Sequence, residues 1–341
     1  MSTPLAIATT GFATSVGLSA RASCAAIRAG ITNPTETRFA STSRQWIMAH
    51  QVPLSEPWRG RARLVQFAAL AIEECLPNRT ATEWEQIPLL LCISERSRPG
   101  RIEGLEDRLL EDVQRALRVR FSRDSTIIPQ GRTSVATALA HARALLDAGV
   151  APDVMIAATD SFVTARTLSE YQKLDRLLSP GSPDGFIAGE GGAALLVTRH
   201  VGEPSLGLIG IGLAREPAPI GSGEPLRADG LTAAIRGALE DAAVEMHQID
   251  FRVTDISGEQ YYFKEAALAL SRTLRVVKEE FDIWHPAECI GEAGAMSGVA
   301  VIAAARAACQ KGYTKGPNVL THWANDAGQR AALTLRYRAA T

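Results

Sequence analysis

The chain has 341 residues, of which 46% are hydrophobic and 21% charged, and its formal net charge is −1 at pH 7. A length above about 250–300 residues allows two fused cores or one large layered body. The near-neutral charge gives no basic field for nucleic acid or an anionic membrane. The longest apolar runs are strand-length, far short of the roughly 20 residues of a membrane helix.

The first half of the chain alternates short apolar runs with helical patterns. Strands are predicted at 4–12, 87–94, 125–128, 153–159 and 189–197, and helices at 19–29, 61–76, 105–117 and 133–147. The helix over 133–147 has the cleanest apolar spacing. Thr133 or Ser134 is expected to cap its start, and Gly149 its end.

The second half repeats this rhythm. Strands are predicted at 206–213, 251–256, 319–323 and 331–337, and helices at 231–246, 262–274 and 293–310. Alternating strands and helices favour a largely parallel, covered sheet in each half. An Ala-rich helix among the strands of each half suggests a layered duplicate.

The N-terminus does not look like a signal peptide, because no positive charge precedes Arg21 and Thr and Gly interrupt its apolar stretch. The cysteines show no CxxC or metal-ligand spacing. They stand at Cys24, Cys75, Cys92, Cys289 and Cys309. We therefore expect a cytoplasmic protein with reduced thiols, mostly in the core, and with no metal or cofactor.

The segment 184–196, DGFIAGEGGAALL, resembles the DGFxxGEGAGALxL segment of β-ketoacyl synthases, which are thiolase-fold enzymes of fatty-acid and polyketide synthesis. Residues 6–31 are similar to the family's opening strand and helix, 291–298 to its GHxxGAAG turn, and 319–335 to its last hairpin. The resemblance implies an α/β fold, a thiolase-like five-layer αβαβα sandwich of two duplicated halves. We place these halves at 1–200 and 201–341, within one body.

The chemistry of that family requires a thiolate at a helix N-terminus, two histidines and an oxyanion hole of two backbone N–H groups. By the resemblance, the nucleophile falls at Gly131 or Arg132, neither of which is nucleophilic. The first histidine aligns with Ser257 and the second with Glu292. A carboxylate at Glu292 cannot donate a hydrogen bond to an enolate, and its charge opposes a forming anion.

Two further family positions also differ. The lysine that precedes the second histidine aligns with Ala287, and the gatekeeper phenylalanine aligns with Asp326. Catalytic positions thus depart from the pattern while scaffold positions keep it. Ordinary decarboxylative condensation is therefore not expected.

Some residues could replace the lost groups. A hydroxyl at Ser134 could attack an acyl group, although residues at a helix start are more often caps. Cys289 could be a migrated nucleophile, but a lone loop cysteine is usually inert. His322 could form an acid–base set with Asp326 or Glu292, although a single histidine at a strand end is more often structural. Glu190 is better interpreted as holding the Gly-rich turn.

If Arg132, Glu259, Glu292 and Asp326 converge, the pocket is charged, and we favour a buried ion-pair network over a new active site. The sequence thus predicts a catalytically degenerate, non-condensing protein that acts as a structural or partner subunit. Chain-length factors are the family precedent, and Gln130 is a weak pointer to them.

The expected assembly is a homodimer, or a heterodimer with an active synthase-like protein, with acyl carrier protein as a further candidate partner. Two alternatives stay open. One is an acyl transferase or thioesterase-type enzyme that uses Ser134 or Cys289. The other is a module that binds acyl groups or a carrier protein.

Overall fold

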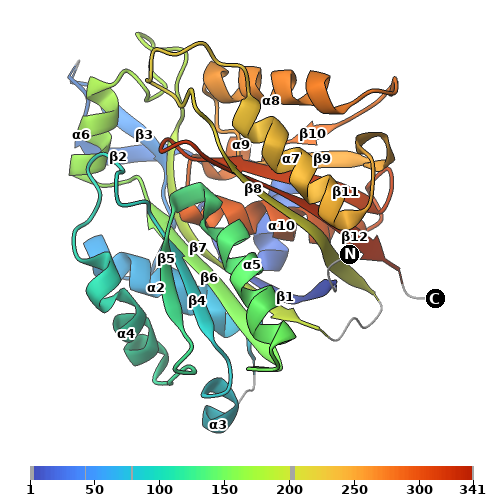
Figure 1. Cartoon of the computed structure of the whole chain (residues 1–341). Coiled ribbons are helices and arrows are strands. Elements are labelled where there is room, and N and C mark those ends of the chain that lie inside the picture. The colour runs from blue at the N-terminus through green and yellow to red at the C-terminus, as the bar shows by residue number, and fades with distance from the viewer. Residues whose placement is uncertain (1–3, 43, 78–79, 200–203, 340–341) are drawn as a thin grey trace.

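Strands from both halves of the chain form one continuous sheet (Figure 1), in a computed structural model that describes residues 4–42, 44–77, 80–199 and 204–339. The strand order is β10-β9-β11-β12-β8-β1-β7-β6-β4-β5, and β2 and β3 join it at β7. The strands span Leu5–Ala13 (β1), Thr35–Ala40 (β2), Trp46–His50 (β3), Leu89–Ile93 (β4), Thr126–Pro129 (β5), Asp153–Ser161 (β6), Ala188–Thr198 (β7), Ser205–Arg215 (β8), Phe251–Thr254 (β9), Ile283–Trp284 (β10), Asn318–Ala324 (β11) and Gln329–Arg338 (β12).

The two halves of this sheet have the same topology. The order β1-β7-β6-β4-β5 corresponds to β8-β12-β11-β9-β10, and in each set the first two pairings are antiparallel and the next two parallel. The halves join where β1 pairs with β8, with Leu5 opposite Leu208. The boundary at residue 200 stays a prediction, because 200–203 lie outside the described residues.

The sequence predicts a largely parallel sheet in each half. That prediction is wrong, because half of these strand pairings are antiparallel. Four residues, 325–328, separate β11 from β12. A connection this short can only reverse the chain, whereas a parallel pairing needs a crossover of about a dozen residues or more. The β11–β12 hairpin is therefore antiparallel, and each half has a mixed sheet.

Helices complete five layers, as Figure 1 shows. Helices α5 and α10 lie between the two sheet halves, α2 and α4 cover the first half, and α7 and α8 cover the second. The helices span Ala20–Arg28 (α1), Gly60–Cys75 (α2), Ala81–Trp84 (α3), Leu105–Leu117 (α4), Ser134–Asp147 (α5), Ala165–Lys173 (α6), Asp229–Ala242 (α7), Gln260–Thr273 (α8), Ala287–Ile290 (α9) and Ala295–Gln310 (α10). This architecture confirms the α/β thiolase-like αβαβα sandwich.

The composition of α10 explains its central place. A helix that is apolar all round belongs inside a protein, and α10 is built mainly from Ala, Val and Gly. Gly298 allows a close approach to α5, since a methyl group there would lie 2.9 Å from Cγ2 of Val135. The N-terminus of α10 can thus reach the start of α5.

One expected helix end and one expected helix cap are wrong. The helix predicted over 231–246 ends at Ala242, because Ala243 adopts a left-handed backbone with φ of 51°. The side chain of Thr133 makes no capping hydrogen bond to α5, because a 3₁₀ turn over Gly131–Thr133 already precedes the helix. The short elements β2, β3, β10, α3, α6 and α9 were not predicted.

Candidate functional site

Gly131, which with Arg132 is one of the two positions where the resemblance places a nucleophile, stands between β5 and α5. Its φ is 58°, in the left-handed region that favours glycine. A methyl group on Gly131 would overlap Oε2 of Glu95 and lie 2.8 Å from the Glu95 carboxyl carbon. The same methyl group would lie 3.3 Å from Nη2 of Arg98. The Glu95 carboxylate, from the loop after β4, therefore occupies the space that a side chain at this position would need.

Arg98 holds that carboxylate in place. Its Nη2 donates to Oε2 of Glu95 at 2.6 Å, and its Nη1 donates to Oδ1 of Asp160, at the end of β6, at 2.7 Å. The guanidinium also stacks on the Phe162 ring at 4.3 Å. Asp160 in turn accepts a hydrogen bond from the Ala295 N–H at 2.8 Å, which links the cluster to the start of α10. All three charged side chains are buried.

Arg132, also buried, reaches to the other side of the site. Its Nη1 donates to Oε2 of Glu292 at 3.2 Å, and its Nη2 donates to Oδ1 of Asp326 at 3.4 Å. Its Nε lies 3.6 Å from Oδ2 of Asp255, and its Cζ lies 4.3 Å above the Tyr262 ring. One guanidinium thus contacts three carboxyl groups and an aromatic face.

Ser257 and Glu292, the two positions aligned with the family's histidines, bond to each other. The Ser257 hydroxyl donates to Oε2 of Glu292 at 2.7 Å. The Gly294 N–H donates to Oε1 of Glu292 at 3.0 Å, just before α10. With Arg132, these groups give the Glu292 carboxylate three donors, so it is satisfied without a ligand.

Asp326, aligned with the gatekeeper, accepts from four side chains. Two are arginines: Arg132, and Arg176, whose Nη1 donates at 2.6 Å. The hydroxyls of Tyr262 and Tyr171 donate at 2.5 and 3.3 Å. Against the effect of burial, Arg176 and Arg132 hold the pKa of Asp326 well below its ordinary range.

Arg176 connects this carboxylate to Glu259. Its Nε and Nη2 donate to the two Glu259 oxygens at 2.5 and 2.9 Å, a bidentate pair. Burial lowers the pKa of Arg176, but Glu259 and Asp326 outweigh that effect and raise it above its ordinary value. Three of the four charged residues singled out from the sequence thus meet directly, and Glu259 joins them through Arg176.

These ion pairs form what we call the charged network. Its members are Glu95, Arg98, Arg132, Asp160, Arg176, Asp255, Glu259, Glu292 and Asp326. Three cations thus face six carboxyl groups. Burial raises the pKa of Asp255 to about 7, with Arg132 opposing the rise and Glu292 adding to it. Burial also raises the pKa of Asp160 and of Glu259, against the lowering effect of Arg98 and Arg176 respectively.

Ser134 lies beside the network with its hydroxyl engaged by the backbone. Its Oγ lies 3.1 Å from the Ile128 carbonyl and 3.4 Å from the Ile93 carbonyl, and it accepts from the Gln130 N–H at 3.0 Å. The side chain is fully buried. The Ser134 hydroxyl therefore ties the turn before α5 to the ends of β4 and β5.

The other proposed substitutes lie in different surroundings. Cys289 is buried in α9 and lines a separate cavity of about 440 Å³ with Trp284, and burial raises its pKa. His322 is buried on β11 between Thr254 and Ala332. Burial, with Arg252 and His285 adding to the effect, lowers the pKa of His322 to about 3, so it is neutral at pH 7.

Glu190 is buried and bonds away from the charged network. It accepts from the Val52 N–H at 3.1 Å, from Nε of Arg63 at 3.0 Å and from the Ser161 hydroxyl at 2.9 Å. These partners come from three separate segments. The contacts are those of a residue that holds β7 to its neighbours.

Sequence reasoning missed several residues of the site, namely Glu95, Arg98, Asp160, Tyr171, Arg176 and Tyr262. For two of them, the sequence does carry a signal, which is an acidic residue at or just after the end of a predicted strand. Glu95 and Asp160 follow or end the parallel strands β4 and β6, and the carboxyl ends of parallel strands are where sites gather. Reading polar residues at strand ends, without reference to the family motifs, would have brought them to notice.

The described part of the chain contains no cluster of His, Cys, Asp and Glu side chains suited to a metal ion. Across the same residues, no helix is both long and apolar enough to span a bilayer. The candidate site consists of charged and hydroxyl side chains that bond to one another.

The strand order and the five layers define the class of fold, that of the thiolase-like ketosynthases. Comparison of the whole chain with solved structures finds several with a similar fold. A chain from the ketosynthase ApeO–chain length factor ApeC complex of Xenorhabdus doucetiae is 14% identical, with a TM-score of 0.79 and coverage of 98% of both chains. The ishigamide ketosynthase/chain length factor is 17% identical, with a TM-score of 0.73 and coverage of 98% and 99%.

The ketosynthase from module 6 of the Bacillus subtilis bacillaene synthase is 12% identical, with a TM-score of 0.79. The alignment covers 99% of this chain and 72% of that one. No protein-family sequence model and no curated protein sequence matches the chain. At these identities the likeness establishes the fold.

Proposed function

We propose that the protein is a non-condensing, ketosynthase-like partner subunit. The observation that carries the proposal is the Glu95 carboxylate packed against Gly131, because it fills the space that a nucleophilic side chain would need. Arg98 holds Glu95 there with a buried ion pair. A scaffold whose reacting position is filled in this way acts through binding.

Electrostatics also oppose condensation at this site. Decarboxylation of a malonyl unit generates an enolate, which requires hydrogen-bond donors aimed at the developing negative charge. Here Glu292 and Asp326 are acceptors, and the donors around them, Arg132 and Ser257 among them, are already used. The charged network therefore serves stability in place of anion chemistry.

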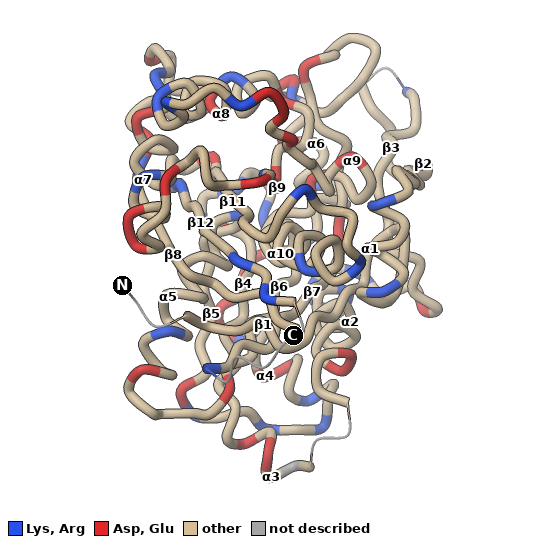
Figure 2. The backbone as a smooth tube through the Cα atoms, turned by 90° about the vertical axis from the view of Figure 1, so that its right-hand side faces the viewer, with Lys and Arg blue, Asp and Glu red and all other residues tan. Residues whose placement is uncertain are grey.

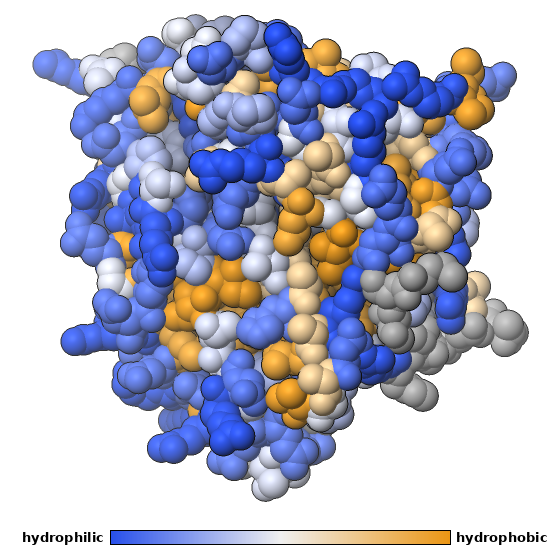
Figure 3. All heavy atoms as spheres, in the orientation of Figure 1, coloured by the Kyte–Doolittle hydropathy of each residue, from blue (hydrophilic) through white to orange (hydrophobic). Residues whose placement is uncertain are grey.

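The end of the sheet supports a partner role. β5 is a terminal strand that pairs with β4, so its outer edge has no strand neighbour in the described part of the chain. Edge strands recruit strands from other chains. Figure 3 shows apolar residues over the region of β5 and α5. Two of the structural neighbours carry ketosynthase and chain length factor together in their names, which favours a synthase-like partner over a second copy of this chain.

The first test looks for acyl chemistry. Purified protein is incubated with malonyl- and acyl-thioesters, and its intact mass is measured, with Ser134→Ala and Cys289→Ser as matched controls. We expect no covalent adduct, because Ser134 bonds to backbone groups and burial raises the pKa of Cys289. A stable adduct that either variant abolishes would refute the non-condensing assignment in favour of an acyl-transfer enzyme.

The second test concerns the partner. The protein is purified from its native source and analysed for a co-purifying synthase by mass spectrometry. Thr126→Asp on β5 is compared with Lys264→Glu, an exposed position on α8. We expect association to be lost only with Thr126→Asp. A self-dimer alone, or association that survives Thr126→Asp, contradicts the partner role.

A further inference from the structure

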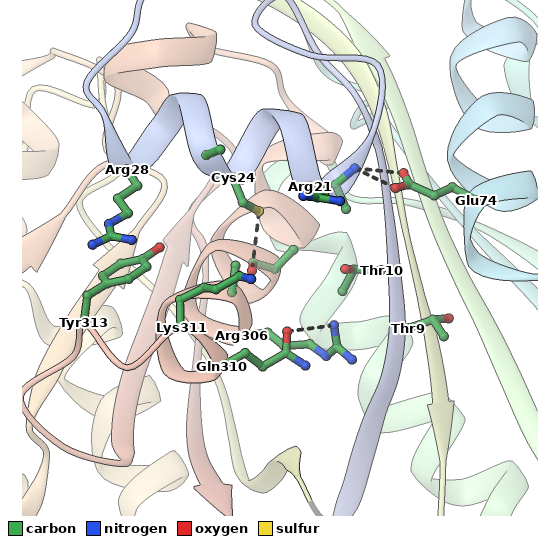
Figure 4. Close-up of a pocket in the computed structure, with 14 residues that line it drawn as sticks. Thr9, Thr10, Arg21, Cys24, Arg28, Glu74, Arg306, Gln310, Lys311 and Tyr313 are labelled. Atoms are coloured by element: carbon green, nitrogen blue, oxygen red, sulfur yellow. Dashed lines mark hydrogen bonds between the residues drawn. The ribbon is translucent and has the colours of Figure 1, made fainter. Parts of the chain in front are cut away.

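A cavity of about 630 Å³ lies between α1, β1 and the C-terminal part of α10. Its size falls within the roughly 300–1,000 Å³ typical of small-molecule sites. Figure 4 shows Arg21 and Arg28 on α1 on one side, and Arg306, Gln310 and Lys311 from the end of α10 on the other. The charged network lies at the opposite, N-terminal end of α10, so this is a separate site.

The cavity is strongly cationic. Four basic side chains line it, namely Arg21, Arg28, Arg306 and Lys311, against one carboxylate, Glu74. That carboxylate is already occupied, because it accepts from the Ala20 N–H at 2.9 Å and from the Phe12 N–H at 2.8 Å. Figure 2 shows Lys and Arg positions gathered around α1 and α10 on this face. An anion entering the cavity would meet positive charge without a competing free carboxylate.

Arg306 is the most informative of these cations. Its Nε donates to the Ile7 carbonyl at 3.2 Å and its Nη2 to the Ala8 carbonyl at 2.7 Å, at an irregularity of β1. Its Nη1 has only a 3.4 Å contact with Gln310. No carboxylate of the described residues lies within ion-pair distance of Arg306. Burial therefore lowers the pKa of Arg306, and an anion nearby would stabilise its charge.

A second compartment adjoins the first. The cavity of about 440 Å³ shares Cys24, Arg28 and Tyr313 with it. The guanidinium of Arg28 stacks over the Tyr313 ring at 4.1 Å and forms the divider between them. Beyond this divider most of the lining side chains are apolar, Ile27 and Trp284 among them, and His285 and Glu288 are its polar members. The two compartments form one groove, with a cationic end and an end lined mainly by apolar side chains.

We propose that this groove binds an amphipathic small molecule, with a carboxylate or phosphate head beside Arg306 and Lys311 and an alkyl or aromatic body reaching past Tyr313 toward Trp284. An inorganic anion would leave the apolar walls unused, and a neutral lipid would leave the cations unpaired. The proposal does not depend on the partner role, because it uses none of the residues of the charged network.

Calorimetry with four probes tests the proposal: decanoate, decyl phosphate, decanol and inorganic phosphate, each below its aggregation concentration. We expect one or both decyl anions to bind at least tenfold more tightly than decanol and inorganic phosphate. The tighter of the two identifies the head group. If decanol or phosphate binds as tightly as the decyl anions, or if neither decyl anion binds, the proposal is wrong.

Variants then locate the binding. Lys311→Glu and Arg28→Glu change exposed side chains and are expected to weaken the decyl anion at least tenfold, whereas Lys264→Glu on α8 leaves it unchanged. Arg306→Gln is expected to have the largest effect, but it also removes contacts to β1. Binding that survives both Lys311→Glu and Arg28→Glu overturns the assignment.

Discussion

Gly131→Ala is the most direct probe of the filled nucleophile position. The added methyl group would overlap the Glu95 carboxylate, so Glu95 must shift, and its ion pair with Arg98 is strained or broken. The substitution also forces an L-residue to keep a φ of 58°. Two separate costs thus arise from one methyl group.

Their sum is large compared with ordinary protein stability. A left-handed backbone costs an L-residue about 1–2 kcal/mol. Removing one partner of a buried ion pair costs about 3–5 kcal/mol, which is an upper bound for displacing Glu95 from Arg98. We therefore expect Gly131→Ala to lower the free energy of unfolding by more than the backbone cost alone and by up to about 7 kcal/mol, when whole domains are stable by only about 5–15 kcal/mol.

Urea unfolding followed by circular dichroism measures the loss, and Gly149→Ala is the matched control. Gly149 has a φ of 66° with nothing within 4 Å of an added methyl group, so it should show only the backbone cost of about 1–2 kcal/mol. The double variant Glu95→Ala/Gly131→Ala should lose less stability than the sum of its single changes, because the overlap is gone. Equal losses for Gly131→Ala and Gly149→Ala would refute the filled-site reasoning.

Two further predictions follow from buried charge. Arg132→Met should destabilise the fold by about 3–5 kcal/mol, since it leaves three carboxyl groups facing each other, and adding Glu292→Gln should recover part of that loss in urea unfolding. Burial lowers the pKa of His50 from 6.5 to about 4, so the fold favours the neutral imidazole. The stability that His50 contributes is therefore fully present above pH 6.5 and is lost as the pH falls toward 4. Between pH 7 and 5, His50→Gln should therefore lose about 2 kcal/mol less stability than the unsubstituted protein, and an identical loss in both contradicts the assignment.

The sequence predicts most of the long elements, because their apolar spacing is regular. The range of α4 is predicted to the residue, and α5 to within one. Short elements such as β10 and α9 depend on tertiary contacts, since two to four residues carry no period. The antiparallel pairings could not be derived from the alternation of strands and helices alone, because they depend on which strand each segment pairs with after the chain reverses direction.

For the site, the sequence predicts which positions depart from the family pattern but not what fills the space. Arg132, Glu292 and Asp326 do lie together. Glu95 carries no periodic signal, and its place against Gly131 depends on how the loop after β4 folds over β5. The geometry of the Arg98 pair is likewise set by tertiary structure.

The charged network divides unequally between the two sheet halves. Arg132 and Arg176 come from the first half, whereas the carboxyl groups that they contact come from the second: Asp255, Glu259, Glu292 and Asp326. During synthesis, the first half leaves the ribosome while two of its cations lack their counterions and while β1 is not yet paired with β8. We expect it to stay incompletely packed until the segment that carries Asp326 has also been made. The two halves are therefore expected to fold together, and neither half made alone should reach a stable fold.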